Sequence, residues 1–515
     1  MTRFTVEPLP PRPNLEHQQK LAKRLLREVW AGNAAALERV RTFLAGAADP
    51  ATLKLHDAQA VIARGYGFDS WAAMKRKIES LTRSPLEQFD IAVREGDAQR
   101  VRELLEAHAD VGARINEPRF DFDSPAIHQA KKNLPLVDVL LQHGADINAR
   151  STFWAGSFGI LEWDLTLEEA KPLISRGARI TPWAAAGLGL YDELKSILRT
   201  HPDSIHEPGG DGKSVLHFAA TPAIAELLLD SGADVRARDV DHRSTALQYL
   251  IADEAIARLL VARGAEVDIF AAARLGDRSL VERCLRDDPL CAEARVNRVP
   301  QFAAPGGHIY GWTLGFDLTP ADVARKFGHA EIAELIVSAL APKARFIDAL
   351  WCGDAERTRR ELQHHSEVLK ELGPYEHSLL AAAAWWYRPE CVRLMLEVGF
   401  DPHVTGAHDS TPLDRASFHG YADIVATLLA LDPHPPLLRK NEFGVTPLGT
   451  CIHGSIHGWK TGYPQDHVRT LGLLLEAGLP VDPTNLPTGN DELDAVMRAW
   501  LQAGGGESSE GGGKL

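Results

Sequence analysis

Apolar residues recur along most of this chain at the three- and four-residue spacing of amphipathic helices. The stretch from Gly210 to Asp239 shows the pattern most fully. It contains a Gly-Asp-Gly turn, a short run from Ser214 to Ala220, an apolar stripe that includes Leu228, and a stop at Gly232. Because glycine accepts the left-handed conformation that closes many helices, Gly232 marks a helix end. The stretch therefore predicts a turn, a short helix, a second turn and a longer helix.

Copies of this unit recur along the chain from about Leu86 onward. The Gly-Ala pairs that begin at Gly144 and Gly177 lie 33 residues apart, and those at Gly232 and Gly264 lie 32 apart. One unit leaves an apolar face uncovered, so it needs stacked neighbours. Residues 86–482 hold about twelve such units at this period. The sequence therefore predicts an all-α solenoid of about twelve helix-turn-helix repeats with a helical N-terminal cap.

Four amphipathic helices are predicted before the repeats, at Leu15–Trp30, Ala34–Leu44, Leu55–Tyr66 and Trp71–Leu81. One interpretation is a helix-turn-helix that places the basic run at Lys75 on a phosphate backbone. The other is a helical cap that covers the first repeat. The cap is favoured, because the segment lacks a second basic element and a polar face that could contact base edges.

Composition shifts and interruptions of the period divide the chain into six parts. These are a disordered arm at 1–14, a helical segment at 15–84, a first block of repeats at 85–295, an insertion at 296–316, a second block of repeats with a C-terminal cap at 317–502, and a flexible tail at 503–515. The arm is rich in proline and the tail in glycine and serine, which explains their assignment.

The repeat motif resembles the ankyrin repeat. Thr411-Pro412-Leu413, Ala416, an inner Gly420 and the Leu428-Leu429 pair carry the resemblance, and the unit from Gly210 to Asp239 shares it. The layout also resembles a group of bacterial ankyrin-repeat proteins with a short helical N-terminal segment, here Asp57 to Trp71. The resemblance implies binding of other macromolecules on a concave surface of turn tips and inner helices. It brings no catalytic residues.

Charge and cysteine content narrow the classes of partner and compartment. The formal net charge is -14, although residues 1–85 alone carry 14 basic and 8 acidic side chains. An acidic body argues against nucleic acid as a partner, because that affinity rests on Lys and Arg contacts to phosphates. No run of 18 apolar residues and no apolar leader is present, so neither a membrane span nor a secretory signal is expected. Five scattered cysteines without a CxxC pair indicate a cytoplasmic protein.

Sequence motifs of the common enzyme classes are missing. There is no GxxxxGK[ST] loop, no GxSxG elbow and no HExxH pair. We therefore expect no enzyme activity and no cofactor or metal. His128 and His217 occupy the fourth position of the Thr-Pro-Leu-His motif, where an imidazole bonds neighbouring backbone, so a structural role is expected for both.

Two insertions concentrate histidine and aromatic residues. One holds His308, Tyr310 and Trp312, and the other runs from His453 to His467. Segments that interrupt a repeat often carry function. His453 and His457 have the spacing of a helical metal pair, but Gly454 and Gly458 favour a loop. The interpretations are packing of the loops on adjacent repeats and a metal or catalytic site, and packing is favoured.

The adjacent tryptophans 385 and 386 end an inner helix. Neighbouring helical residues point about 100° apart, so one of the two faces away from the core and could anchor a partner. The candidate partner-binding residues are His308, Tyr310, Trp312, Trp385, Trp386, His419, His453, His457 and Trp459.

Two functional hypotheses follow. The first is a non-catalytic scaffold for a protein partner. The second is a small-molecule or metal-binding protein, or an enzyme, whose two His/Trp insertions converge.

Overall fold

The computed structural model describes residues 5–44, 52–296, 307–483 and 486–503. Every regular element in these ranges is a helix, which confirms the all-α prediction. Residues 297–306 of the predicted insertion and residues 504–515 of the predicted tail lie outside the described residues. None of the described helices is long and apolar enough to cross a membrane.

The chain forms two compact units. The first unit joins Met1–Thr82 to Ala341–Leu515, and the second is Arg83–Leu340.

Four helices form the N-terminal segment, within a residue or two of their predicted bounds. They are α1 (Leu15–Trp30), α2 (Ala34–Phe43), α3 (Leu55–Gly65) and α4 (Trp71–Thr82). Their starts follow from capping, since the Asn14 side chain accepts from the backbone N–H of His17 at 2.9 Å. The segment has its own core, in which Leu26, Ile62 and Met74 are almost fully buried.

The N-terminal segment contacts the closing helix of the first unit, α29 (Asp491–Gln502). The Lys54 ammonium lies 2.9 Å from the Asp491 carboxylate. The Arg498 guanidinium stacks over the Trp30 ring at 3.8 Å. That the segment also covers the first repeat stays a prediction.

The second unit contains the predicted repeats one to eight, each built around a pair of short helices except the third. The pairs are α5 (Pro85–Glu95) with α6 (Ala98–Ala107), α8 (Ala126–Gln129) with α9 (Leu134–Gln142), α11 (Pro182–Gly187) with α12 (Tyr191–Thr200), η5 (Val215–Phe218) with α13 (Pro222–Asp230), α14 (Ala246–Tyr249) with α15 (Glu254–Ala262), α16 (Ile269–Leu275) with α17 (Arg278–Asp287), and α19 (Pro320–Lys326) with α20 (Ala330–Ser338). The degenerate third repeat keeps only α10 (Leu167–Ser175), and α7 (Ala109–Gly112) and α18 (Tyr310–Thr313) are single turns. Short 3-10 turns lie at η2 (Asp121–Asp123), η3 (Pro202–His206), η4 (Gly210–Gly212) and η6 (Pro289–Glu293).

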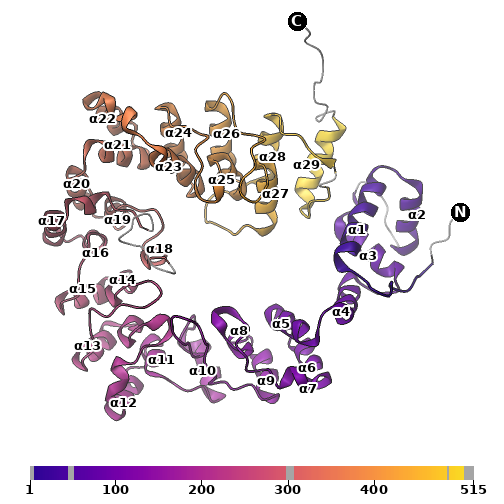
Figure 1. Ribbon diagram of the computed structural model, residues 1–515, viewed down its shortest axis with the longest axis horizontal. Helices are drawn as coiled ribbons and strands as arrows, with labels where there is room; N and C mark the ends of the chain where they lie inside the picture. The colour runs from indigo at the N-terminus through magenta and orange to yellow at the C-terminus, as the bar shows by residue number, and fades with distance from the viewer. Residues whose placement is uncertain (1–4, 45–51, 297–306, 484–485, 504–515) are drawn as a thin grey trace, which may run out of the picture. The chain divides into compact units, whose positions relative to one another are not determined.

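The first unit contains repeats nine to twelve. Their pairs are α21 (Pro342–Trp351) with α22 (Ala355–His364), α23 (Pro374–Trp385) with α24 (Pro389–Glu397), α25 (Pro412–His419) with α26 (Ala422–Leu431), and α27 (Pro447–His457) with α28 (His467–Glu476). Two 3-10 turns, η8 (Ser366–Glu371) and η9 (Ala407–Asp409), lie between pairs. We call the first helix of each pair the inner helix. Inner helices pack on inner helices, as α23, α25 and α27 do, and second helices pack on second helices (Figure 1).

The short helix predicted after Ser214 is a single 3-10 turn, η5, rather than an α-helix. Its backbone turns extended at Ala219, and Thr221 already caps the next helix. The repeat therefore lacks the residues that would complete an α-helical turn. Gly232 has φ +97°, which confirms the predicted left-handed helix stop.

Close packing explains the glycine turn at Gly210. A Cβ at this position would lie 2.1 Å from the Phe158 ring, so no larger residue fits.

Imidazoles join neighbouring repeats, as predicted. His128 Nε2 lies 2.8 Å from the Ala149 carbonyl oxygen, and His217 Nε2 lies 3.1 Å from that of Ser244.

Candidate functional site on the inner helices of repeats ten to twelve

An aromatic cluster covers the ends of three consecutive inner helices. It consists of Trp385 on α23, Phe418 and His419 on α25, and Trp459 just after α27. The Trp385 ring stacks nearly parallel to Phe418 with centroids 5.6 Å apart. The Trp459 ring lies 5.9 Å from Trp385 and 5.6 Å from Phe418. The fold therefore brings candidates from three repeats into one continuous surface.

Exposure differs sharply within this cluster. Trp459 is 56 % exposed, Trp385 and Phe418 are half-buried, and His419 is only 2 % exposed. A large aromatic that is more than half exposed loses favourable burial in the free protein, and a partner can restore it. Trp459 is thus the member most available to a partner, while His419 supports the rings around it.

His419 is a neutral packing residue. Its ring centroid lies 4.3 Å from that of Trp385 and 5.0 Å from that of Tyr421. Burial, with smaller effects of His467 and Arg415, lowers the pKa of His419 to about 4. The imidazole is therefore uncharged at neutral pH and does not provide a charged contact to a partner.

His453 and His457 lie on one face of α27, because this helix continues to His457. Their ring centroids are 4.6 Å apart, and both residues are exposed. The expected loop at this position was wrong. Among the described residues, no third histidine, cysteine or carboxylate joins the pair in a metal-sized group.

Gly454 explains why the loop prediction failed. A Cβ added at this position would lie 1.8 Å from the backbone carbonyl oxygen of Phe418. The glycine permits a close approach of α25 and α27 instead of interrupting the helix. This approach seats Trp459 on Phe418.

A tyrosine stack continues the cluster toward the start of α26. Tyr463, which is 50 % exposed, stacks on Tyr387 with centroids 5.0 Å apart. The Tyr387 hydroxyl donates to the Asp423 carboxylate at 2.8 Å. Burial and this carboxylate raise the pKa of Tyr387 to about 12, so its hydroxyl stays a donor. Trp386 lies beside the stack, half-buried against the core of the unit.

A cavity of about 390 Å³ adjoins the aromatic cluster. We call it the Asp414 cavity. Its walls come from the inner helices α23, α25 and α27 and from the turn tips of repeats eleven and twelve. The lining residues are Trp385, His408, Ser410, Asp414, Arg415, Phe418, Asn441, Phe443, Val445, Thr450 and His453. Most of these surfaces are apolar or aromatic, as in sites that take a side chain or a small ligand.

In the second unit, the described end of the 296–316 insertion folds back onto repeats six and seven. Tyr310 is fully buried, and its hydroxyl donates to both carboxylate oxygens of Asp268, at 3.0 and 2.9 Å. His308 is 5 % exposed and accepts from the backbone N–H of Tyr310 at 3.2 Å. Burial lowers the pKa of His308 to about 4 and raises that of Tyr310 well above 10. Both side chains hold the insertion in place. Tyr310 presents no surface to a partner, and His308 contributes only a small part of the wall of a neighbouring cleft.

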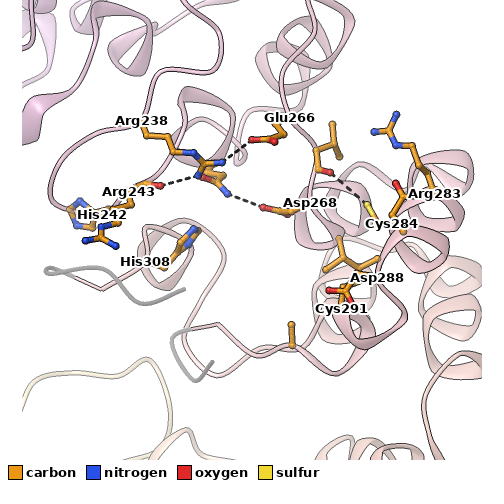
Figure 2. Close-up of a pocket in the computed structure, with 15 residues that line it drawn as sticks. Arg238, His242, Arg243, Glu266, Asp268, Arg283, Cys284, Asp288, Cys291 and His308 are labelled. Atoms are coloured by element: carbon orange, nitrogen blue, oxygen red, sulfur yellow. Dashed lines mark hydrogen bonds and ion pairs between the residues drawn. The ribbon is translucent and has the colours of Figure 1, made fainter. Parts of the chain in front are cut away.

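Trp312 differs from these two neighbours because it is 59 % exposed. Its ring lies 5.3 Å from that of His242, edge to face. His242 lines a polar cleft of about 630 Å³ in which Arg238 is held by Glu266 at 2.9 Å (Figure 2). Burial lowers the pKa of His242, but nearby Asp239, Asp241 and Asp211 outweigh burial and raise it.

A second aromatic surface in this unit escaped sequence analysis. It lies at the turn tips of repeats two and three and consists of Phe122, Phe153, Trp154, Phe158 and Trp163. Trp154 is 60 % and Trp163 49 % exposed. The sequence contained a signal for this surface, because Trp154 and Trp163 lie in a stretch without helical periodicity.

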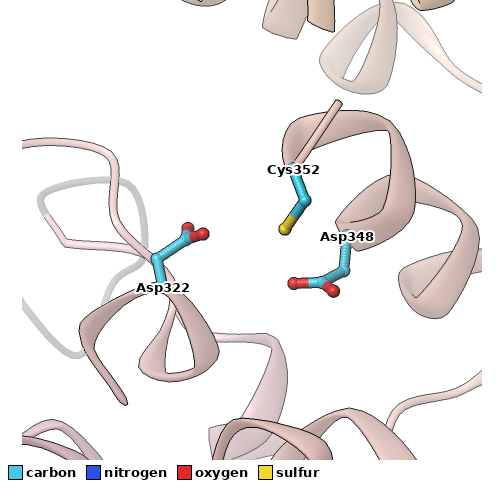
Figure 3. A group of neighbouring side chains, drawn as sticks. All are labelled: Asp322, Asp348 and Cys352. Carbon is cyan, nitrogen blue, oxygen red and sulfur yellow. The ribbon is translucent and has the colours of Figure 1, made fainter. Parts of the chain in front are cut away.

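One buried carboxylate of the first unit has a structural role. Asp348 lies near the end of α21, one turn before the exposed Cys352 (Figure 3). It pairs with Arg357 of α22 and so joins the two helices of repeat nine. Trp351, on the same helix, is core, at 1 % exposure.

Comparison with known proteins supports the repeat assignment at one place. The model of the ankyrin repeat family matches residues 211–240. Among solved structures, the human ASB11 ankyrin repeat domain is similar at 18 % identity, covering 58 % of this chain and 97 % of that chain. The TM-score of this similarity is 0.23. Among curated protein sequences, none matches this chain.

Proposed function

We propose that this chain is a non-catalytic scaffold that binds a protein partner through the inner helices and turn tips of repeats ten to twelve. In ankyrin arrays these elements form the concave surface. The observation that carries the proposal is the aromatic cluster, in which exposed Trp459 lies on half-buried Trp385 and Phe418 beside a cavity of about 390 Å³.

The arrangement has the features of a binding hot spot. Such sites combine tryptophan, tyrosine or arginine with a pocket that desolvates them on binding. Here Trp385 already carries the Arg415 guanidinium at 4.6 Å from its ring centre, which fixes the ring. A partner therefore meets a preorganised surface, and less conformational entropy is lost on binding.

The described histidines of the site do not form a catalytic arrangement. His467 bonds the Phe418 carbonyl oxygen at 3.1 Å, and His419 is packed among aromatic rings. His453 and His457 contact each other. A general base needs an imidazole within hydrogen-bond reach of a nucleophile or substrate proton, and these contacts support packing instead.

The alternative is a small-molecule or metal site formed by the two His/Trp insertions. It is supported by the helical pair of His453 and His457 and by the polar cleft near His308. His308 and Tyr310 are buried, however, which leaves Trp312 as the accessible residue of that insertion. The scaffold is therefore the better supported function. The free cysteines, two of them buried, agree with the proposed cytoplasmic location.

Selection of displayed peptides on the full-length chain tests the proposal. We expect the selected peptides to lose affinity for a Trp459→Ala variant and to keep it for Trp312→Ala, which removes an equally exposed tryptophan from the other unit. Peptides that bind both variants as well as the original chain would place the binding surface elsewhere.

A further inference from the structure

We propose that the Asp414 cavity receives a basic side chain, lysine or arginine, from the partner polypeptide. The charged end donates to Asp414, and the apolar stem lies against the aromatic walls. This inference rests on the proposed scaffold function and names the chemistry that its site recognises.

Asp414 has one carboxylate oxygen without a partner. The residue is 1 % exposed and lines the cavity. Its Oδ2 accepts from the backbone N–H of Thr411 at 2.9 Å and from the Thr411 hydroxyl at 2.8 Å, which caps α25. Its Oδ1 is buried and has no hydrogen-bond partner among the described residues.

The equivalent positions in repeats five, six and eight differ from Asp414, because both of their polar atoms have partners. In repeat five the equivalent His217 bonds the Ser244 carbonyl oxygen at 3.1 Å. In repeat six Gln248 caps its helix and donates to Asp268 at 2.8 Å. In repeat eight Asp322, drawn in Figure 3, caps its helix and lies 3.5 Å from Arg325. Only Asp414, among these four, leaves its second polar atom unused.

A buried carboxylate oxygen without a donor is costly, and a cation with hydrogen-bonding N–H groups relieves this cost most effectively. Burial raises the pKa of Asp414, and the hydrogen bonds from Thr411, with smaller effects of Arg439 and Arg415, offset only part of this effect. Both arginines already interact with other groups. Arg415 donates to the Ala407 carbonyl oxygen and stacks on Trp385, and Arg439 pairs with Asp409 at 2.7 Å. The additional cation therefore has to come from the partner.

The walls of the cavity suit the rest of a basic side chain. Trp385, Phe418, Phe443 and Val445 offer apolar and aromatic surface, and Phe443 is 67 % exposed. Lysine and arginine lay their methylene groups along such surfaces, and their charges interact favourably with aromatic faces. The chain's net charge of -14 also favours a basic partner.

Peptide display on the full-length protein tests this inference, followed by isothermal titration of individual selected peptides. We expect the selected sequences to share one lysine or arginine. Replacing it by norleucine, and separately changing Asp414→Asn, should each weaken binding roughly 10- to 100-fold, as loss of a charge-assisted hydrogen bond does. Asp322→Asn is the matched control, since it alters the same capping position in the other unit, and it should leave the affinity unchanged.

The outcomes separate this inference from the scaffold proposal. Peptides that depend on Trp459 but share no basic residue, or that bind Asp414→Asn unchanged, overturn the inference and leave the scaffold standing. Failure to select any peptide counts against both. If Asp414→Asn does not fold, the norleucine peptide on the unchanged protein decides. Phe443→Ala provides a further check, because this exposed residue caps no helix and its loss should weaken only peptides that carry the basic residue.

Discussion

Replacement of Gly454 by alanine tests how the aromatic cluster is assembled. The added Cβ would lie 1.8 Å from the Phe418 carbonyl oxygen, whereas a tolerable carbon–oxygen contact is about 3.3 Å. Helices α25 and α27 must then separate by about 1.5 Å, the difference between these two distances. Trp459 would move away from Phe418 and Trp385 as α27 shifts.

Overpacking of this kind costs about 1–3 kcal/mol, and the backbone contact puts Gly454→Ala at the upper end of that range. Hydrogen exchange is the suitable assay, because repeat arrays open locally and a single global unfolding free energy is poorly defined for them. Amides of α25 and α27 should exchange roughly 5- to 150-fold faster, which corresponds to that cost.

Gly472→Ala is the matched control for this prediction. Gly472 lies inside the neighbouring helix α28, and a Cβ there would meet no atom within 4 Å. Alanine should stabilise that helix by about 0.5–1 kcal/mol, because glycine loses more backbone entropy on folding. Unchanged exchange in α25 and α27 of Gly454→Ala would refute the close-packing explanation.

Three further predictions concern the binding surface, the buried His217 and the insertion. Trp459→Ala should lower the affinity for the partner at least about tenfold. The melting temperature should stay near that of the original chain, since the ring is 56 % exposed. Calorimetry measures the affinity and thermal unfolding the melting temperature, and an unchanged affinity contradicts the proposal. Burial lowers the pKa of His217 from 6.5 to about 4. The unfolded chain therefore binds a proton more readily than the folded chain between these pH values. The neutral imidazole contributes about 3 kcal/mol to the folding free energy above pH 6.5, and this contribution is lost as the pH falls toward 4. Hydrogen-exchange protection factors of the η5 and α13 amides at a series of pH values should show that loss, and His217→Gln should flatten it. Equal slopes for the two proteins would exclude His217 as the source. Tyr310→Phe removes a donor to Asp268 and should destabilise α16 and α18 by about 1.5–3 kcal/mol, the range for a hydrogen bond to a charged group, and unchanged hydrogen exchange there would show that the bond contributes little.

The positions of the helices could be predicted from the sequence, because local sequence features determine where helices begin and end. The bounds of α1 to α4 follow from apolar spacing, side-chain caps and glycine stops. Trp385 and Phe418 lie 33 residues apart, one repeat period, so their stacking was also implicit in the pattern. Local periodicity and repeat length therefore carried most of the prediction.

Features that depend on contacts outside the regular repeat pattern were not accessible from the sequence. Gly454 was assigned to a loop because glycine marks turns and close helix contacts alike, and the contacting Phe418 carbonyl belongs to the preceding repeat. The burial of His308 and Tyr310 depends on Asp268 of an earlier repeat. The missing partner of Asp414 is visible only from the surrounding side chains.

A hydrogen-exchange footprint of the full chain with a selected peptide bound tests the central claim most directly. The scaffold proposal predicts slower exchange in α25, in α27 and in the segment from Trp459 to Tyr463. Protection confined to the second helices α24, α26 and α28, or to Arg83–Leu340, would contradict it.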